Sequence, residues 1–185
     1  MNLKIYLAAT LITGWILSGN WIADASRAKV MFSVKGPFGT VHGTFGGLKS
    51  TIRFNEKDPA GSSISATIDP NTVSTGIGLR NHDLRNQEKW LDTKKYPDIS
   101  FHSKKISKSG NEYLASGELT LKGITRPVDI PFTFTANGNT GVFKGKFTIR
   151  REDFNIGKPG GSVGDIITIE LNIPVTTPDS HRPTS

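Results

Sequence analysis

Apolar residues occupy every second position over most of the chain beyond residue 20. One segment carries Val30, Phe32 and Val34, and the last passes through alternate positions from Ile167 to Val175. Successive side chains of a strand point to opposite faces, so each segment has one apolar and one polar face. Turn-forming residues separate the segments at positions 35–37, 59–61, 109–111, 137–139 and 159–161. The pattern predicts an all-β fold of about eight short antiparallel strands, arranged as a sandwich or a closed barrel.

The alternation stops between residues 75 and 96. Leu84, Glu88 and Leu91 fall on one side of a helix, and Trp90 lies beside them. Pro97 ends any helix, because the residue before a proline is disfavoured in the helical conformation. We therefore expect a short helical insertion around residues 76–95 that covers one end of the barrel.

Gly43, Gly117 and Gly145 occupy positions of apolar parity inside the predicted strands. An interior glycine marks a bulge, a bend or a close approach, and on the inward face of a small barrel it also leaves space unfilled. A barrel of about eight strands either fills with side chains or holds one ligand. The sequence leaves two interpretations open: a cavity, or bent strands around a solid core.

The two ends of the chain differ from the alternating region. Lys4 precedes an apolar run over residues 5–17. This arrangement is typical of a secretory signal peptide, and the run is shorter than the roughly 20 residues that span a bilayer. We therefore expect residues 1–19 to be a signal peptide and the protein to be exported, with an uncleaved anchor as the alternative. Residues 178–185 are expected to form a polar tail.

The composition is that of one folded domain. The chain has 185 residues, of which 35% are hydrophobic and 20 are glycine, so a disordered chain is excluded. Cysteine is absent, which excludes a disulfide framework, a thiolate metal site and a cysteine nucleophile. The net charge of +7 is compatible with nucleic acid, an anionic membrane surface or a soluble basic protein. The basic pairs at 94–95, 104–105 and 150–151 lack interleaved exposed aromatics, so no nucleic-acid partner is expected.

No catalytic or metal-binding pattern is present in the sequence. His42, His82, His102 and His181 are isolated, without the spacing that places two imidazoles on one metal. The glycine-rich residues 157–164 lack the ending of a phosphate-binding loop and lead into a strand. We therefore expect no catalytic residue, no metal and no cofactor.

Several segments, in the right order, resemble the YceI-like lipid/polyisoprenoid-binding family. The strongest is Gly117-Glu118-Leu119-Thr120-Leu121-Lys122-Gly123-Ile124-Thr125. The resemblance covers about residues 20–177, which we take as the domain, and its remaining segments are residues 21–34, 36–45, 75–81, 95–101 and 150–157.

The resemblance implies an extended, lipocalin-like antiparallel barrel whose lumen holds a polyisoprenoid, an isoprenoid quinone or a similar long-chain lipid. It also implies a periplasmic binding protein rather than an enzyme, and a homodimer. Apart from the resemblance, we consider transient membrane contact. The residues of inward parity, with two from the irregular segment, are the predicted lining: Phe32, Val34, Phe45, Ile68, Trp90, Leu91, Phe101, Leu119, Leu121, Phe132, Phe134, Phe147, Ile149, Ile169 and Leu171.

The chain departs from the family pattern at residues 80–84. The family often has Arg-Asp-x-His-Leu there, whereas this chain has Asp83 at the usual histidine position and His82 one residue earlier. Arg80 remains, and its guanidinium is a candidate for hydrogen bonding to a quinone or phosphate oxygen of a lipid head group. The alternative is an arginine that ties its loop to a neighbouring carbonyl.

Two other classes of function stay open. In the first, an enzyme converts a bound isoprenoid with Arg80, His82 and Asp83 as acid–base groups. In the second, the barrel is solid and the protein acts through its surface as an interaction module of the cell envelope.

Overall fold

The computed structural model describes residues 19–158 and 160–178 of the chain. The predicted signal peptide and the predicted polar tail with His181 lie outside the described residues, apart from Gly19 and Pro178.

The described residues form nine antiparallel strands, one α-helix and one short 3-10 helix. The helices are α1 (Gly78–Asn86) and η1 (Arg151–Phe154). The strands are β1 (Asn20–Ala23), β2 (Lys29–Gly36), β3 (Gly39–Arg53), β4 (Ser63–Ser74), β5 (Ile99–Ser109), β6 (Glu112–Leu121), β7 (Ile124–Asn137), β8 (Thr140–Arg150) and β9 (Ile166–Thr176).

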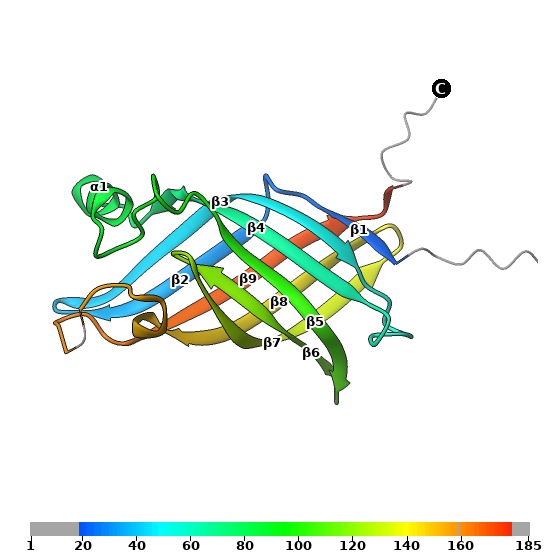
Figure 1. The fold of residues 1–185 in the computed structure, drawn as a ribbon. Helices are drawn as coiled ribbons and strands as arrows, with labels where there is room; N and C mark the ends of the chain where they lie inside the picture. The colour runs from blue at the N-terminus through cyan, green and yellow to red at the C-terminus, as the bar shows by residue number, and fades with distance from the viewer. Residues whose placement is uncertain (1–18, 159, 179–185) are drawn as a thin grey trace, which may run out of the picture.

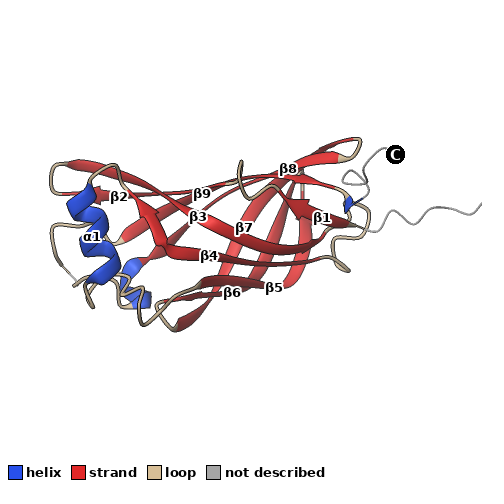
Figure 2. Cartoon of the chain, turned by 90° about the horizontal axis from the view of Figure 1, so that it is seen from above, coloured by secondary structure: helices blue, strands red, loops and turns tan. Residues whose placement is uncertain are grey.

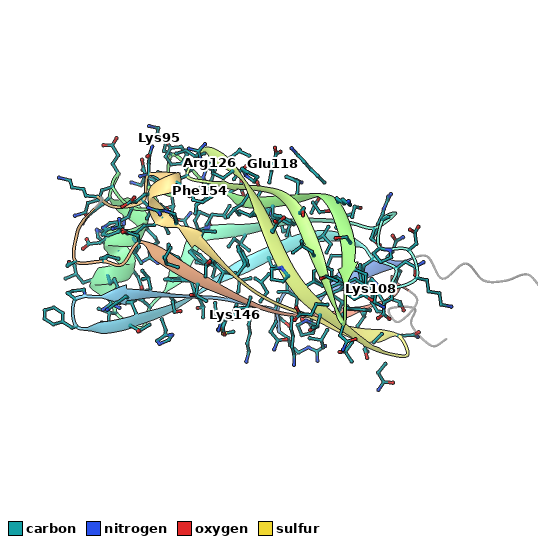
Figure 3. All side chains as sticks on the ribbon, turned by 90° about the horizontal axis from the view of Figure 1, so that it is seen from below. Lys95, Lys108, Glu118, Arg126, Lys146 and Phe154 are labelled. Carbon is teal, nitrogen blue, oxygen red and sulfur yellow. The ribbon has the colours of Figure 1, made fainter. Side chains whose placement is uncertain are left out.

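The sheet closes into a barrel. Its order is β1-β3-β2-β9-β8-β7-β6-β5-β4, and a further pairing between β3 and β4 joins the two sides. Closure leaves the apolar face of each strand inside and the polar face outside. On the outer face His102 contacts the Ser65 hydroxyl at 3.1 Å and Lys146 pairs with Glu170 at 2.8 Å. Figure 3 shows Lys146 and Glu118 directed away from the barrel. The predicted all-β antiparallel barrel is confirmed.

Two short strands share one position in the barrel wall. β1 pairs with the far end of β3 and with the end of β9, whereas β2 pairs with the first half of β3 and the rest of β9. The link between them is held by Asp24, whose backbone N–H donates to the Pro174 carbonyl at 2.9 Å. The hydroxyl of Ser26 and the guanidinium of Arg27 hold the pKa of the Asp24 carboxyl well below its usual range. The nine strands therefore occupy eight positions around the barrel.

The two ends of the barrel are built differently. α1, the β2–β3 hairpin and the β8–β9 connection lie at one end, which we call the α1 end (Figures 1 and 2). The opposite end contains β1 and the last described residues, and we call it the aromatic end.

The aromatic end is filled by rings. Phe54 makes edge-on contacts with Tyr113, Phe132, Phe134 and Phe143 at centroid distances of 4.9–5.4 Å. Trp21 packs edge-on against Phe134 at 5.0 Å and donates its indole N–H to the Phe54 carbonyl. Such pairs add to the burial of large apolar area, and the donated hydrogen bond satisfies the indole. Burial raises the pKa of Tyr113, and the nearby Glu56 carboxylate raises it further.

The interior glycines answer the question that the sequence left open, and the answer differs between positions. Gly117 marks a bend: it pairs with Ser103 beside a bulge in β5, and a Cβ there would lie 2.3 Å from the His102 carbonyl oxygen. Gly145 lines an internal cavity, described below. Bent strands and unfilled space therefore occur in the same barrel.

We predict that Gly117→Ala destabilises the fold much more than Gly46→Ala. At Gly117 the added methyl meets backbone atoms at 2.3 and 2.8 Å, whereas at Gly46 the nearest atoms are side-chain atoms of Thr72 at 3.7–3.9 Å. We expect Gly117→Ala to lower the free energy of unfolding by about 2 kcal/mol or more, because the backbone must shift. Gly46→Ala should change it by less than about 1 kcal/mol. Urea denaturation measures both values, and equal stabilities would contradict the close approach.

Candidate functional site

The barrel encloses a cavity of about 270 Å³ on its axis. The surface of this cavity is almost wholly hydrocarbon, with side chains contributed by every strand from β2 to β9. Along β9 the lining extends from Ile167 to Ile173. At roughly 3.3 Å per residue, that distance is about 20 Å. The cavity is therefore long as well as apolar.

The hollow part of the barrel lies towards the α1 end. Along β9, Ile169 and Leu171 are half-buried, whereas Ile173 and Val175 are buried among other side chains. Along β8, Phe147 is half-buried and lies between the buried residues Phe143 and Ile149. The ring cluster therefore fills the aromatic end, and the unfilled volume lies towards the α1 end.

Two segments cover the cavity at the α1 end. The chain that follows α1 contributes Trp90 and Leu91, and the β8–β9 connection contributes Ile156 and Val163. A hydrogen bond of 2.6 Å from the Gly157 N–H to the Lys89 carbonyl joins the two segments. The insertion predicted to cover one end of the barrel is confirmed.

The helix of this insertion is shorter than residues 76–95. It ends at Asn86, so Glu88 and Leu91 do not share a helical face with Leu84. The carbonyls of Leu84 and Arg85 accept instead from the N–H groups of Leu91 and Thr93, at 3.0 and 2.8 Å, as the chain folds back. The Thr93 hydroxyl also donates to the Asn71 side chain in β4, at 2.6 Å. Contacts between distant parts of the chain thus end the helix.

Nearly all of the predicted lining residues lie along the cavity. They are Phe32, Val34, Phe45, Ile68, Trp90, Leu91, Phe101, Leu119, Leu121, Phe132, Phe147, Ile149, Ile169 and Leu171. Their contact with a ligand stays a prediction.

Phe134 is the exception among the predicted lining residues. It points inward, as its parity requires, but it lies at the aromatic end, 4.4 Å from Phe143 between ring centroids. Alternation fixes the face of a strand on which a residue lies, and it carries no information on position along the barrel axis. The prediction that Phe134 lines the cavity is therefore corrected: it belongs to the ring cluster.

The predicted polar candidates lie outside the lining. Arg80, His82 and Asp83 are all on α1, and none of them lines the cavity. The His82 ring contacts the amide of Asn86 on the same helix, with 3.3 Å between nitrogens. The head-group role of Arg80 and the acid–base alternative both remain predictions without a geometric link to the cavity.

Arg151 is a lining residue that the sequence analysis missed. Its side chain is buried, with 1% of the residue exposed, and it touches the cavity at the α1 end. The guanidinium donates to the β8–β9 connection as follows: Nε to the Gly164 carbonyl at 3.0 Å, Nη1 to Ile156 at 2.9 Å, and Nη2 to Lys158 at 3.0 Å, Val163 at 2.9 Å and Asp165 Oδ1 at 2.9 Å.

A signal for Arg151 was present in the alternation. Ile149 faces inward and Arg150 outward, so position 151 has inward parity. Burying a guanidinium is costly unless hydrogen-bond acceptors surround it. Here backbone carbonyls and one carboxylate are the acceptors. Arg151 therefore holds the β8–β9 connection in place over the cavity, and we call this set of hydrogen bonds the clasp.

Two further features bear on the chemistry of the site. The hydroxyl of Ser50, which lines the cavity, is buried without a hydrogen-bond partner. In the described part of the chain, no group of three or more His, Cys, Asp or Glu side chains is arranged to hold a metal ion. Among the same residues, no helix has the length and apolar character to cross a membrane.

A closed antiparallel barrel around an apolar cavity defines the lipocalin-like class of β-barrels. The YceI-like domain family matches residues 21–175. Protein YceI of Escherichia coli O157:H7 is 33% identical over 140 residues, which are 70% of this chain and 73% of that protein. The chain belongs to the YceI family.

Solved structures share this fold. The crystal structure of BcnA from Burkholderia cenocepacia matches with a TM-score of 0.80 and 30% identity, and the match covers 84% of this chain and 100% of that one. A polyisoprenoid-binding domain from Saccharophagus degradans matches with a TM-score of 0.68 and 17% identity, over 85% of this chain and 98% of that domain. At 17% identity the second likeness concerns the fold alone.

We predict that Arg151→Met destabilises the protein far more than Arg150→Met. The first substitution leaves buried carbonyl oxygens and Asp165 without their donor, and should lower the free energy of unfolding by about 3 kcal/mol or more. Arg150 is exposed and pairs only with Glu152 at 3.4 Å, so its replacement should cost less than about 1 kcal/mol. Urea denaturation compares the two variants. Equal losses would show that the clasp contributes nothing specific.

Proposed function

We propose that this protein is exported to the periplasm and holds a polyisoprenoid, an isoprenoid quinone or a similar long-chain lipid in the barrel cavity. The observation that carries this proposal is the cavity itself, which is long, almost wholly hydrocarbon and closed at one end by rings. The description of the Saccharophagus degradans domain as polyisoprenoid-binding, on the same fold, supports the ligand class.

The driving force for such binding is the removal of hydrocarbon from water. Each Å² of apolar surface that leaves water contributes about 25 cal/mol, so a prenyl chain that buries a few hundred Å² gains several kcal/mol before association costs. An apolar wall responds to the length and width of a chain more than to its chemistry, and even one methylene more or less changes the binding free energy only modestly. We therefore expect tolerance of several lipid tails.

The asymmetry of the barrel gives the ligand a direction. The ring cluster blocks the aromatic end, so a hydrocarbon tail must point towards it from the α1 end. The polar head then lies near the cover formed by Trp90 and the β8–β9 connection. The unpartnered Ser50 hydroxyl offers one hydrogen bond within the lumen to a tail that carries oxygen.

Binding without catalysis fits the site better than the two alternatives. The fold is one of binding proteins, and the three candidate acid–base groups on α1 do not line the cavity. An interaction module with a filled barrel does not need the cavity that the structure contains. The absence of catalysis and the dimer remain predictions for solution experiments.

The first experiment identifies the ligand directly. The protein is expressed with its leader, purified from the periplasmic fraction without detergent and extracted with organic solvent for mass spectrometry. We expect about one isoprenoid or quinone per protein and an intact mass that lacks the leader. An empty extract that stays empty after incubation with prenyl lipids would contradict lipid binding. Recovery of the unprocessed chain with the membrane fraction alone would contradict export in soluble form.

We predict that Leu171→Trp abolishes lipid retention whereas Glu170→Trp preserves it. Leu171 lines the cavity, with its Cδ1 near the space left by Gly145, so a larger ring there occupies the volume that a tail would need. Glu170 is the next residue on the same strand and faces outward, where it pairs with Lys146. Lipid per protein, measured in the same extract, should fall at least tenfold for the first variant only. Undiminished lipid in Leu171→Trp would place the ligand elsewhere.

A further inference from the structure

Large apolar side chains are exposed on two segments at the α1 end. Phe38, at the tip of the β2–β3 hairpin, is fully exposed. Leu79 in the first turn of α1 is 75% exposed, and Ile77 just before it is 49% exposed. Both segments lie at the end of the barrel that carries the cover of the cavity (Figures 1 and 2). Exposed rings and leucines cost solubility, and their grouping indicates a binding surface.

These segments lie side by side. A groove on the outer face of the barrel is lined both by Gly76 and by Ser33 and His42 of the β2–β3 hairpin, which places the start of the helical insertion against that hairpin. On the other side of the hairpin, the Gly164 N–H donates to the Lys35 carbonyl at 2.7 Å. The β8–β9 connection, which carries Lys158, is therefore the third neighbour.

Within the two exposed apolar segments the charges have one sign, although the half-buried Asp83 follows directly on α1. Residues 35–39 and 76–82 contain no aspartate or glutamate, and their charged residues are Lys35 and Arg80. Lys158 is exposed, and the nearest acidic residue that follows it, Asp165, is paired with Arg151. Further along the insertion Lys95 is exposed at the same end (Figure 3), although Glu88 and Asp98 are exposed there as well. We call residues 35–39 and 76–82 together with Lys158 the rim.

We propose that the rim docks the protein on the surface of an anionic lipid bilayer. Apolar side chains beside cations, without acids between them, are the combination that binds peripheral proteins to such surfaces. An aromatic ring such as that of Phe38 is favoured at the boundary between head groups and acyl chains. Lys35, Arg80 and Lys158 match the negative head groups around it.

The rim lies at the end of the barrel where a lipid would enter the cavity. This part of the argument rests on the lipid-binding function proposed above. The cavity is closed at the aromatic end, so a lipid tail enters and leaves between segments at the α1 end. Docking by the rim holds that end against the bilayer, and the tail passes between two apolar media with little exposure to water. The groups that touch the membrane are thus neighbours of the groups that cover the cavity.

Vesicle flotation tests the proposal with the protein purified from the periplasmic fraction. We expect binding to vesicles of phosphatidylcholine mixed with phosphatidylglycerol, because an anionic surface attracts nearby cations, and weaker binding to phosphatidylcholine alone. The double variant Phe38→Ser with Leu79→Ser should bind at least tenfold more weakly. Lys35→Gln with Lys158→Gln should remove the preference for the anionic vesicles, and salt should weaken binding of the wild type.

Ile22→Ser is the matched control. Ile22 is a large apolar residue, 44% exposed, at the aromatic end, so its replacement removes exposed apolar surface, although less of it, from the opposite end of the barrel. We expect unchanged flotation for this variant. Thermal unfolding of every variant establishes that the fold is retained, which the exposure of all substituted side chains favours.

Two results would contradict the proposal that the rim binds the bilayer. One is a wild-type protein that does not float with anionic vesicles, and the other is an Ile22→Ser variant that loses as much binding as the rim double variant. Lipid per protein is measured on the same preparation before vesicles are added. A protein that carries lipid but does not float contradicts the rim and leaves the cavity function intact, whereas one that floats without carrying lipid supports the rim and contradicts the cavity function.

Discussion

The pairing of β3 with β4 is the constraint on which the rest of the structure depends. It turns a strongly twisted sheet into a barrel without free edges, and it forces every inward side chain towards one axis. From then on each inward position has two outcomes. Its side chain packs against other inward side chains and fills the space, as the rings of the aromatic end do, or it borders the part of the axis that stays empty. The irregular pairing between β3 and β4 near Gly46 includes a bulge in β4. Asn71 in this bulge accepts a hydrogen bond from Thr93 and so helps to position the segment that covers the cavity.

The division of the axis into a filled and a hollow half follows from where the rings lie along the strands. Six aromatic side chains gather at the aromatic end, where edge-on packing excludes any ligand. Towards α1 the lining is mainly branched aliphatic, and Gly145 faces Leu171 across one strand pair. One barrel thus contains both a packed aromatic core and an apolar cavity, and Phe132 and Phe143 lie at the boundary between them.

The alternation of apolar residues was enough to predict the strands, their inward faces and most of the cavity lining. It could not place Phe134 at the aromatic end, because parity indicates the face of a strand and not the position along the barrel axis. It could have indicated Arg151, whose position has inward parity. A charged residue is normally assigned to the surface, however, and the conformation of the β8–β9 connection, which supplies its acceptors, cannot be predicted from the alternation. The length of α1 was also beyond the pattern, since the carbonyls of Leu84 and Arg85 are taken by residues that return from further along the chain. In the cases of Arg151 and α1, the difference arises from hydrogen bonds within folded-back connections, which periodicity does not encode.

The place of β9 in the sheet sets the order in which the molecule can be completed. β9 is the last strand to be synthesised, and it lies between β8 and the position shared by β1 and β2. Before it exists, the strands already made form at most an open sheet with two bare edges, and β1 has only half of its partners. The barrel cannot close while any of β9 is still to be made. Its closure is therefore a step that follows synthesis of β9, and the earliest residues of the domain find their final neighbours only when the latest ones are present.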